Sequence, residues 1–169
     1  MHPYVPATIR RLRRLLKGIP VAMLTTHAVG GAAHSRPMLV HGLDETGWLW
    51  FMTDRHSRKA WELGQNPQAT ISFQSPEADR FISVQGTAVV VSDDAKTNSL
   101  WRSSMRVWFP GGRRDPSIVL VAVRVDTAEY WLVPRRRIAR LAGVARAMLT
   151  GKRHEAGRHG VLELYARIA

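Results

Sequence analysis

The densest group of residues that could bind an anion lies between Thr53 and Lys59, where an apolar run gives way to Asp-Arg-His-Ser-Arg-Lys. This pattern predicts a strand end, a tight polar connection and a helix that starts near Ser57. Backbone N–H groups at a helix N-terminus lack intrahelical partners, and the helix dipole favours an anion there. Arg58 and Lys59 in the first turn oppose that dipole by about 0.3–1 kcal/mol each, unless an anion lies beside them. These residues alone leave a phosphate site and a solvated basic turn equally open.

Arg36 could bring a third cation to the same place. We expect the first three strands to form an antiparallel meander; they span residues 21–27, 34–43 and 48–53. In that arrangement the strand that carries Arg36 runs beside the strand that leads to Ser57. A guanidinium can bind two phosphate oxygens through its planar fork. Convergence of Arg36, Arg58 and Lys59 therefore predicts a phosphate pocket, although a single strand arginine is more often a surface residue.

Other groups of reactive side chains do not indicate catalysis. His27, His34 and His41 recur at intervals of seven, but a turn interrupts the series and no carboxylate joins it, so we predict no metal site. Ser35 and Ser57 lack an accompanying histidine–acid relay. The sequence has no Gly-rich loop of the dinucleotide or nucleotide-hydrolase type. We assign no catalytic acid, base or nucleophile.

The elements that would position these residues are mainly β-strands. Residues 1–19 carry Ile9, Leu12 and Leu16 at helical spacing, which predicts an N-terminal helix. Residues 20–133 have the alternating pattern of strands. Further expected elements are a short helix over 57–64, strands over 69–74, 80–91 and 118–133, and a helix over 93–108. Gly86 within one of these strands indicates a bend or a barrel corner.

Residues 134–169 are expected to form a basic C-terminal helical extension, with a last short strand near 161–165. The length of 169 residues suits one domain over 1–169. Six or seven short strands with helices inserted singly predict a mainly β fold, a small antiparallel barrel with peripheral helices.

The net charge of +12 is confined to the two ends of the chain. Residues 1–20 contribute +5 and residues 135–169 contribute +7, whereas residues 21–134 carry 11 basic and 11 acidic side chains. Solvated helix faces explain such charges, so we expect no specific nucleic-acid binding. There is no cysteine and no apolar run long enough for a membrane span. We therefore expect a cytoplasmic protein without disulfides or thiolate metal sites.

Several segments, in this order and spacing, resemble one known family. They are His34-Ser35-Arg36-Pro37-Met38, Leu49-Trp50-Phe51-Met52-Thr53, Ser57-Arg58-Lys59-Ala60, Asn66-Pro67 and Ser83-Val84-Gln85-Gly86-Thr87-Ala88. Together they resemble the pyridoxamine-phosphate-oxidase-like split β-barrels. Trp108-Phe109-Pro110, Glu129-Tyr130-Trp131 and residues 148–153 are similar to the branch that contains general stress protein 26. The resemblance covers roughly residues 10–165.

This resemblance implies a six- to seven-stranded split barrel that forms a homodimer, with flavin mononucleotide (FMN) at the subunit interface. Arg36, Arg58 and Lys59, at the helix start that includes Asp54 and Ser57, would hold the phosphate. The isoalloxazine ring would lie against Pro37, Met38, Met52 and Thr53. Trp108 and Trp131 would close the site from the partner subunit, with core or dimer packing as the alternative for both.

The departures from the oxidase pattern limit what the resemblance implies. His41 stands near the place where the oxidase has a lysine, and Arg135-Arg136-Arg137-Ile138-Ala139-Arg140 lacks the histidine of the Arg-x-His-x-Arg element. The resemblance therefore predicts a flavin-dependent oxidoreductase of unknown substrate rather than a vitamin B6 oxidase. Three alternatives stay open: a flavin-buffering protein without turnover, a protein that binds deazaflavin or FAD, and a basic nucleic-acid binder.

Overall fold

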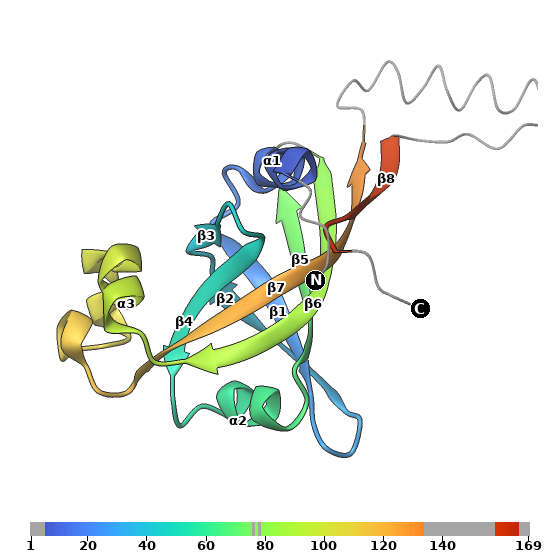
Figure 1. Ribbon diagram of the computed structural model, residues 1–169. Helices are drawn as coiled ribbons and strands as arrows, with labels where there is room; N and C mark the ends of the chain where they lie inside the picture. Colours follow the sequence, from blue (N-terminus) through green and yellow to red (C-terminus); the bar gives the residue numbers. More distant parts are fainter. Residues whose placement is uncertain (1–5, 76, 78, 134–157, 166–169) are drawn as a thin grey trace, which may run out of the picture.

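The computed structural model describes residues 6–75, 77, 79–133 and 158–165. Three helices, two short 3-10 helices and eight strands make up this part of the chain (Figure 1). In chain order the elements are α1 (Pro6–Leu16), β1 (Val21–His27), β2 (Ala33–Leu39), β3 (Gly42–Leu43), β4 (Trp48–Asp54), α2 (Arg58–Gln65), β5 (Gln68–Ser75), β6 (Arg80–Val91), α3 (Asp94–Leu100), η2 (Ser103–Val107), η3 (Gly112–Arg114), β7 (Ile118–Leu132) and β8 (Arg158–Glu163).

The strands form one antiparallel sheet in the order β2-β1-β5-β6-β7-β4-β3, and β8 pairs with β7 outside this path. The sheet curves so that β2, at one end of the strand order, approaches β4, near the other end of that order (Figure 1). β2 and β4 do not pair. This is the mainly β, split-barrel architecture that the sequence predicts, and the expectation is confirmed.

The predicted three-strand meander is wrong in one respect. β2 pairs with β1 from Val21↔Leu39 to His27↔Ala33, but β4 pairs with β7 along its whole length instead of with β2. The chain bends between the two strands, where Gly42 adopts a φ of 124° that favours glycine. β4 pairs there only with the two-residue strand β3. Tertiary pairing with the long apolar β7 thus separates β4 from its neighbour in sequence, and leaves a gap between β2 and β4.

Gly86, where the sequence predicts a bend or a barrel corner, lies at a β-bulge. The β6–β7 register shifts there, from Gln85↔Thr127 to Gly86↔Val125, so that Asp126 is the extra residue on β7. A Cβ atom at Gly86 would lie 2.2 Å from the carbonyl oxygen of Arg124. Only glycine permits this close approach, which bends β6 and β7 together.

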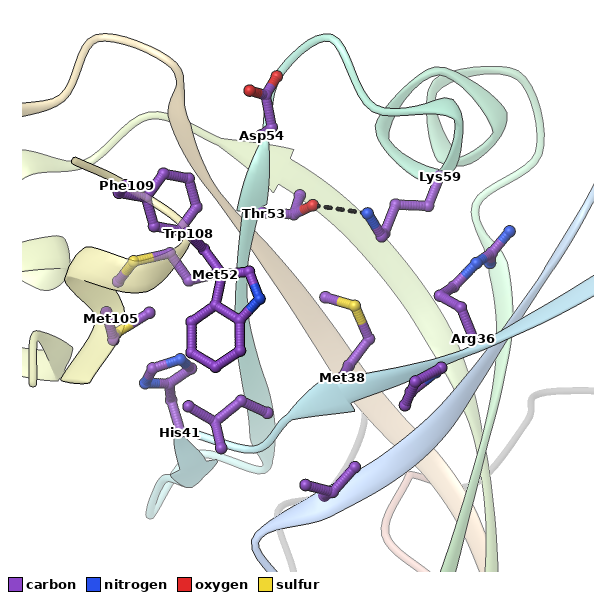
Figure 2. Close-up of a pocket in the computed structure, with 13 residues that line it drawn as sticks. Arg36, Met38, His41, Met52, Thr53, Asp54, Lys59, Met105, Trp108 and Phe109 are labelled. Carbon is purple, nitrogen blue, oxygen red and sulfur yellow. Dashed lines mark hydrogen bonds between the residues drawn. The ribbon is translucent and has the colours of Figure 1, made fainter. Parts of the chain in front are cut away.

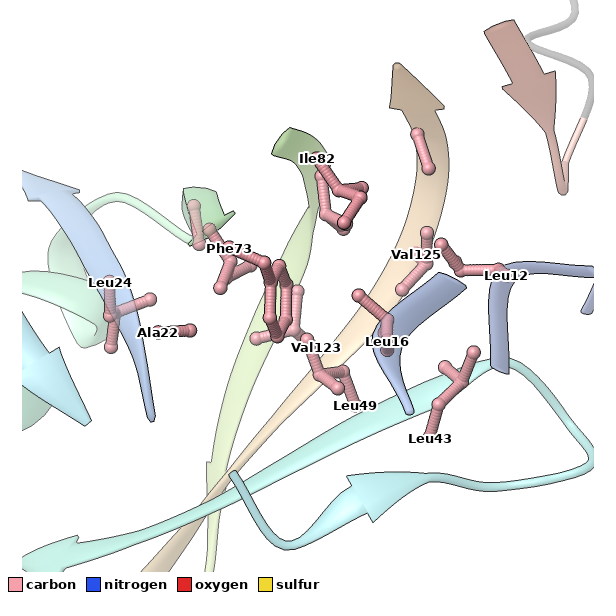
Figure 3. Packing of buried hydrophobic residues seen from close by; sticks show 14 of the residues in the cluster. Leu12, Leu16, Ala22, Leu24, Leu43, Leu49, Phe73, Ile82, Val123 and Val125 are labelled. Atoms are coloured by element: carbon pink, nitrogen blue, oxygen red, sulfur yellow. The ribbon is translucent and has the colours of Figure 1, made fainter. Parts of the chain in front are cut away.

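The core lies between the inner face of the sheet and helix α1. Leu12 and Leu16 of α1 face Leu49, Val123 and Val125 of the sheet (Figure 3), and all five are buried. The predicted apolar stripe of the first helix therefore caps one end of the barrel. Each such side chain contributes roughly 1.5–3 kcal/mol by its burial.

The predicted helix over 93–108 is interrupted. α3 ends at Leu100, Trp101 and Arg102 are extended, and the chain continues as η2 and η3. This segment packs through Met105 and Phe109 against Ile118 and Leu120 of β7, in a second small core. The expected C-terminal helix lies outside the described residues, and β8 takes the place of the expected last strand.

Candidate functional site

A cavity of about 470 Å³ opens where β2 and β4 approach without pairing (Figure 2). β1, β2, the segment after β2, β4, α2 and the η2 region all contribute to its wall. The lining residues are Val21, Arg36, Pro37, Met38, Leu39, His41, Met52, Thr53, Asp54, Lys59, Met105, Trp108 and Phe109.

The cavity lies beside a free edge of β4. The backbone of Trp50 accepts a hydrogen bond from the His41 N–H, on the side that faces β3. Because backbone hydrogen-bonding groups alternate in direction along a strand, the N–H and C=O of Met52 point to this same side. β3 begins at Gly42, which pairs with Trp50, so the described part of the chain places no strand opposite Met52. A bound molecule could therefore pair with this backbone.

One end of the cavity is cationic. Arg36 on β2 and Lys59 in the first turn of α2 both line it, and the Lys59 ammonium donates to the Thr53 hydroxyl at 2.9 Å (Figure 2). Burial lowers the pKa of Lys59 below its ordinary value, the charge of Arg36 lowers it further, and Asp54 partly offsets both. The two cations therefore repel each other in a partly desolvated place, and an anion bound between them would relieve that repulsion.

A buried carboxylate holds Arg36 in this position. Glu62 of α2 is fully buried, and its Oε2 accepts from Arg36 at 3.2 Å and from the Thr26 hydroxyl. Its Oε1 accepts from Arg58 at 2.8 Å and lies 2.7 Å from Nδ1 of His34. The group connects α2 with both strands of the β1–β2 hairpin. Glu62 thus fixes the Arg36 guanidinium at the wall of the cavity.

The ionisation of Glu62 depends on these partners. Burial alone would raise the pKa of its carboxyl, but hydrogen bonds from Thr26, His34 and Arg36 outweigh burial and lower the pKa to about 2. Glu62 is therefore a carboxylate at neutral pH, and it offsets part of the positive charge that Arg36 and Arg58 bring to α2.

The other end of the cavity is apolar and aromatic. Met38, Met52 and Met105 are buried in its wall, and Trp108, which is 64% exposed, also lines it (Figure 2). A polarizable wall of this kind suits a flat ring system.

His41 is the one titratable group at this apolar end among the cavity's lining residues. Its Nδ1 donates to the carbonyl of Leu100 at 3.2 Å, and its buried Nε2 has no partner. Burial lowers the pKa of His41, the hydrogen bond to Leu100 partly offsets this, and Arg102 lowers it further. The ring is therefore neutral at pH 7, with Nε2 available as an acceptor.

The structure brings most of the predicted site residues together. Eight line the cavity: Arg36, Pro37, Met38, Met52, Thr53, Asp54, Lys59 and Trp108. Ser57 lies just behind it, with its hydroxyl 3.3 Å from that of Thr53. Arg58 turns away, because its guanidinium contacts Glu62 and lies 3.2 Å from Nε2 of His34. Of the three expected cations, Arg36 and Lys59 therefore line the cavity, whereas Arg58 forms an ion pair with Glu62 outside it.

The two tryptophans occupy different places. Trp108 lines the cavity of its own chain, whereas we expected it to come from a partner subunit. Trp131 pairs with Phe81 and stacks on His159 near the C-terminal end of β7. The cavity lies near the other end of β7, where Ile118 pairs with the lining residue Asp54. Trp131 follows Ile118 by thirteen positions, which correspond to about 40 Å of extended strand. Trp131 is therefore distant from this cavity, and its role toward a partner's cavity stays a prediction.

Sequence reasoning missed Glu62 as part of the site. Its spacing of four residues from Arg58 indicates a helical ion pair, but such pairs are usually solvated. Nothing local in the sequence shows that Thr26, His34 and Arg36 from a separate hairpin would surround it. Met105 and Phe109 were missed for the same reason, because the break in the helix after Leu100 brings them to the cavity.

The model of one protein family, pyridoxamine 5'-phosphate oxidase like, matches residues 7–155. This match spans most of the chain and all of the cavity. The chain belongs to the pyridoxamine 5'-phosphate oxidase-like family. The resemblance found in the sequence is thus confirmed.

Relatives by sequence include Protein bli-3 of Neurospora crassa, which is 28% identical over 139 residues, or 77% of this chain and 66% of that protein. A pyridoxine/pyridoxamine 5'-phosphate oxidase of Paraburkholderia phymatum is 38% identical over 71 residues, or 42% of this chain and 33% of that enzyme. The chain therefore spans about two thirds of the first relative and one third of the second.

Solved structures show the same fold. A protein from Jannaschia sp. CCS1 that carries the name general stress protein 26 superposes with a TM-score of 0.71 at 20% identity, covering 94% of this chain and 99% of that one. The general stress FMN/FAD binding protein of Xanthomonas citri has a TM-score of 0.64 at 28% identity, covering 76% and 90%. The first likeness shows the fold alone, and the second adds a relative that is named for flavin binding.

Two further features do not occur in the described part of the chain. No three His, Asp or Glu side chains there lie in a group that could hold a metal ion. None of the helices in that part combines the length and apolar character needed to cross a bilayer.

Proposed function

We propose that this protein binds FMN in the cavity between β2 and β4, and that it is a cytoplasmic flavin-dependent oxidoreductase. The observation that carries the proposal is the division of the cavity, with Arg36 and Lys59 at one end and Met38, Met52 and Trp108 at the other. A phosphorylated, flat and largely apolar molecule matches both ends. The relatives named above for FMN/FAD binding and for oxidase activity support the same choice.

The proposed roles follow from the contacts of each residue. Lys59 and Arg36 would bind the phosphate through charged hydrogen bonds of about 1.5–3 kcal/mol each. The free backbone of Met52 would pair with the polar edge of the ring, and Met38 would pack against its face. Trp108 would cover the ring and exclude water.

A bound flavin would supply hydride or electron transfer, whereas the protein contributes position and electrostatics. His41, neutral at pH 7, would form part of the wall at the apolar end of the cavity. No side chain is assigned as an acid–base catalyst, and the substrate is left open.

We also propose a homodimer with the flavin at the subunit interface. The outer face of the sheet exposes large apolar side chains on β1, β6, β7 and β8: Val21, Met23, Phe81, Trp131 and Val161. Apolar side chains spread over several strands of one sheet are typical of an interface. Obligate dimers bury more than about 2,000 Å² in total, and an interface over this face would be of that kind.

Lys59 provides the sharpest test of the phosphate assignment. Lys59→Met keeps the length of the side chain and removes its charge, so FMN binding should weaken about ten-fold or more while riboflavin binding stays nearly unchanged. The matched control is Arg58→Ala, which removes the adjacent cation outside the cavity and should have a smaller effect on FMN. Fluorescence quenching of each flavin on titration with protein measures both.

Two results would contradict the assignment: equal losses for FMN and riboflavin with Lys59→Met, or no loss for either. Mass spectrometry of the cofactor released from purified protein then distinguishes FMN from FAD and from a deazaflavin.

A further inference from the structure

A second cavity, of about 620 Å³, adjoins the first. It lies between the C-terminal end of α1, the Gly18–Pro20 connection and the Val40–Leu43 segment, and His41 lines both cavities. Its polar wall consists of Arg13, Arg14, Lys17 and Arg102. We call the surface formed by these four side chains the basic groove.

The charge of the basic groove is largely unneutralised. No acidic side chain of the described residues lines it. Arg13 lies 3.8 Å from Glu45, but both side chains are largely exposed, and such pairs contribute little. Four cations from two distant parts of the chain thus share one concave surface.

Capping of the α1 carbonyls does not account for this cluster. Cations are favourable at a helix C-terminus because the last carbonyls lack partners. Here Arg80 of β6 already donates to the carbonyl of Arg14 at 3.2 Å and to that of Lys17 at 2.9 Å. The side chains of Arg14 and Lys17 are therefore not needed for capping. Arg102 belongs to the segment after α3 and owes nothing to this helix.

The position of the groove indicates which end of the flavin it would face. In Figure 2, Arg36 and Lys59 lie on the side of the first cavity opposite to His41 and Trp108. The groove continues from the His41 side, where the ring would lie, and not from the phosphate side. An anion bound in the groove would therefore belong to a second molecule and not to the tail of the cofactor.

We infer that the basic groove binds the phosphate or diphosphate group of a second, elongated ligand, the substrate or electron donor, whose other end reaches the flavin cavity past His41. This inference rests on the proposed flavin site for the role of the ligand, although the anion site itself does not. Each of the two cavities has the size of a small-molecule site, and cations at this density bind phosphate oxygens through charged hydrogen bonds.

The test uses inorganic pyrophosphate as the probe, titrated by calorimetry into the full-length protein saturated with FMN. The variant Lys17→Glu with Arg102→Glu reverses two charges in the groove. The control variant Arg10→Glu with Arg113→Glu makes the same change in net charge at exposed positions outside both cavities. We expect pyrophosphate binding about ten-fold or more weaker in the groove variant, binding within about two-fold of wild type in the control, and equal melting temperatures for the two variants.

Three outcomes would overturn the inference. One is no measurable pyrophosphate binding by the wild type, and another is an equal loss in the groove and control variants. The third is a loss of affinity for FAD but not for FMN in the groove variant, which would assign the groove to the cofactor's own tail. A duplex oligonucleotide that binds more tightly than pyrophosphate, with the same dependence on the groove, would instead make it a nucleic-acid surface and reject the small ligand.

The titration is repeated on flavin-free protein. If the protein holds no flavin but pyrophosphate still binds through Lys17 and Arg102, the proposed function fails and the anion site stands. If flavin binds normally and pyrophosphate does not, only the groove assignment fails.

Discussion

Replacement of Glu62 by glutamine tests whether this buried carboxylate organises the site. Glu62→Gln keeps the shape of the side chain and removes its charge. The carboxylate accepts from Thr26, Arg36 and Arg58 and pairs with His34. Removing one member of a fully buried ion pair costs about 3–5 kcal/mol. Arg36 and Arg58 are 20% and 66% exposed and can be hydrated in the variant, so we expect a smaller loss, about 2–3 kcal/mol of unfolding free energy at pH 7.

The loss should depend on pH in a direction that the pKa of Glu62 fixes. Its pKa is lowered from 4.5 to about 2 in the folded protein. A carboxyl with a lowered folded pKa stabilises the fold fully above its unfolded pKa, and this contribution disappears as the pH falls through the folded pKa. The difference between wild type and Glu62→Gln should therefore be complete above about pH 5.5 and shrink to about half by pH 3.

Urea denaturation of flavin-free protein at pH 7 and at pH 3 measures both differences. The control is Glu45→Gln, since the Glu45 side chain is 87% exposed; it should change stability by less than about 0.5 kcal/mol. A loss for Glu62→Gln that is the same at both pH values would refute the ionised role of Glu62. A loss no larger than that of the control would refute its role altogether.

Two further substitutions test the bulge and the interface. Gly86→Ala should lower the unfolding free energy by about 1–3 kcal/mol or more, because its Cβ would lie 2.2 Å from a backbone oxygen. The control Gly64→Ala in α2 places a Cβ that meets no atom within 4 Å, so it should stabilise the protein by about 0.4–1 kcal/mol. Thermal melts that rank the two variants in the reverse order would contradict the bulge. Met23→Asp should convert a dimer at micromolar concentration into a monomer and abolish flavin binding, whereas Val29→Asp in the β1–β2 turn should do neither. Sedimentation of a stable monomer that retains flavin would reject a flavin site shared between the subunits.

Local sequence patterns were sufficient for much of the barrel. The alternation in residues 80–91 and 118–133, the apolar spacing of Ile9, Leu12 and Leu16, and the isolated Gly86 each act over a few residues. They therefore predict strands, a helix and a bend or barrel corner without knowledge of the fold. The order of short motifs identified the family for the same reason, because this order is read directly along the chain.

The pairing of the strands could not be obtained in this way. Residues 34–43 and 48–53 are neighbours in sequence and were expected to pair, but β4 pairs with β7, which lies more than sixty residues further along the chain. Local turn chemistry competes here with burial of the long apolar strand. The burial of β7 on both faces decides the outcome, and no local pattern measures it.

The sequence by itself determined which residues carry the cations and the apolar wall, namely Arg36, Lys59, Met38 and Met52, because residue type is local. Only the tertiary structure decided that Arg58 supports Glu62 instead of facing the cavity, because four partners from three elements compete for one buried carboxylate. It also decided that the cavity exists, since β2 and β4 could have closed the barrel by pairing. The free edges left by that missing pair are what make a binding site there physically possible.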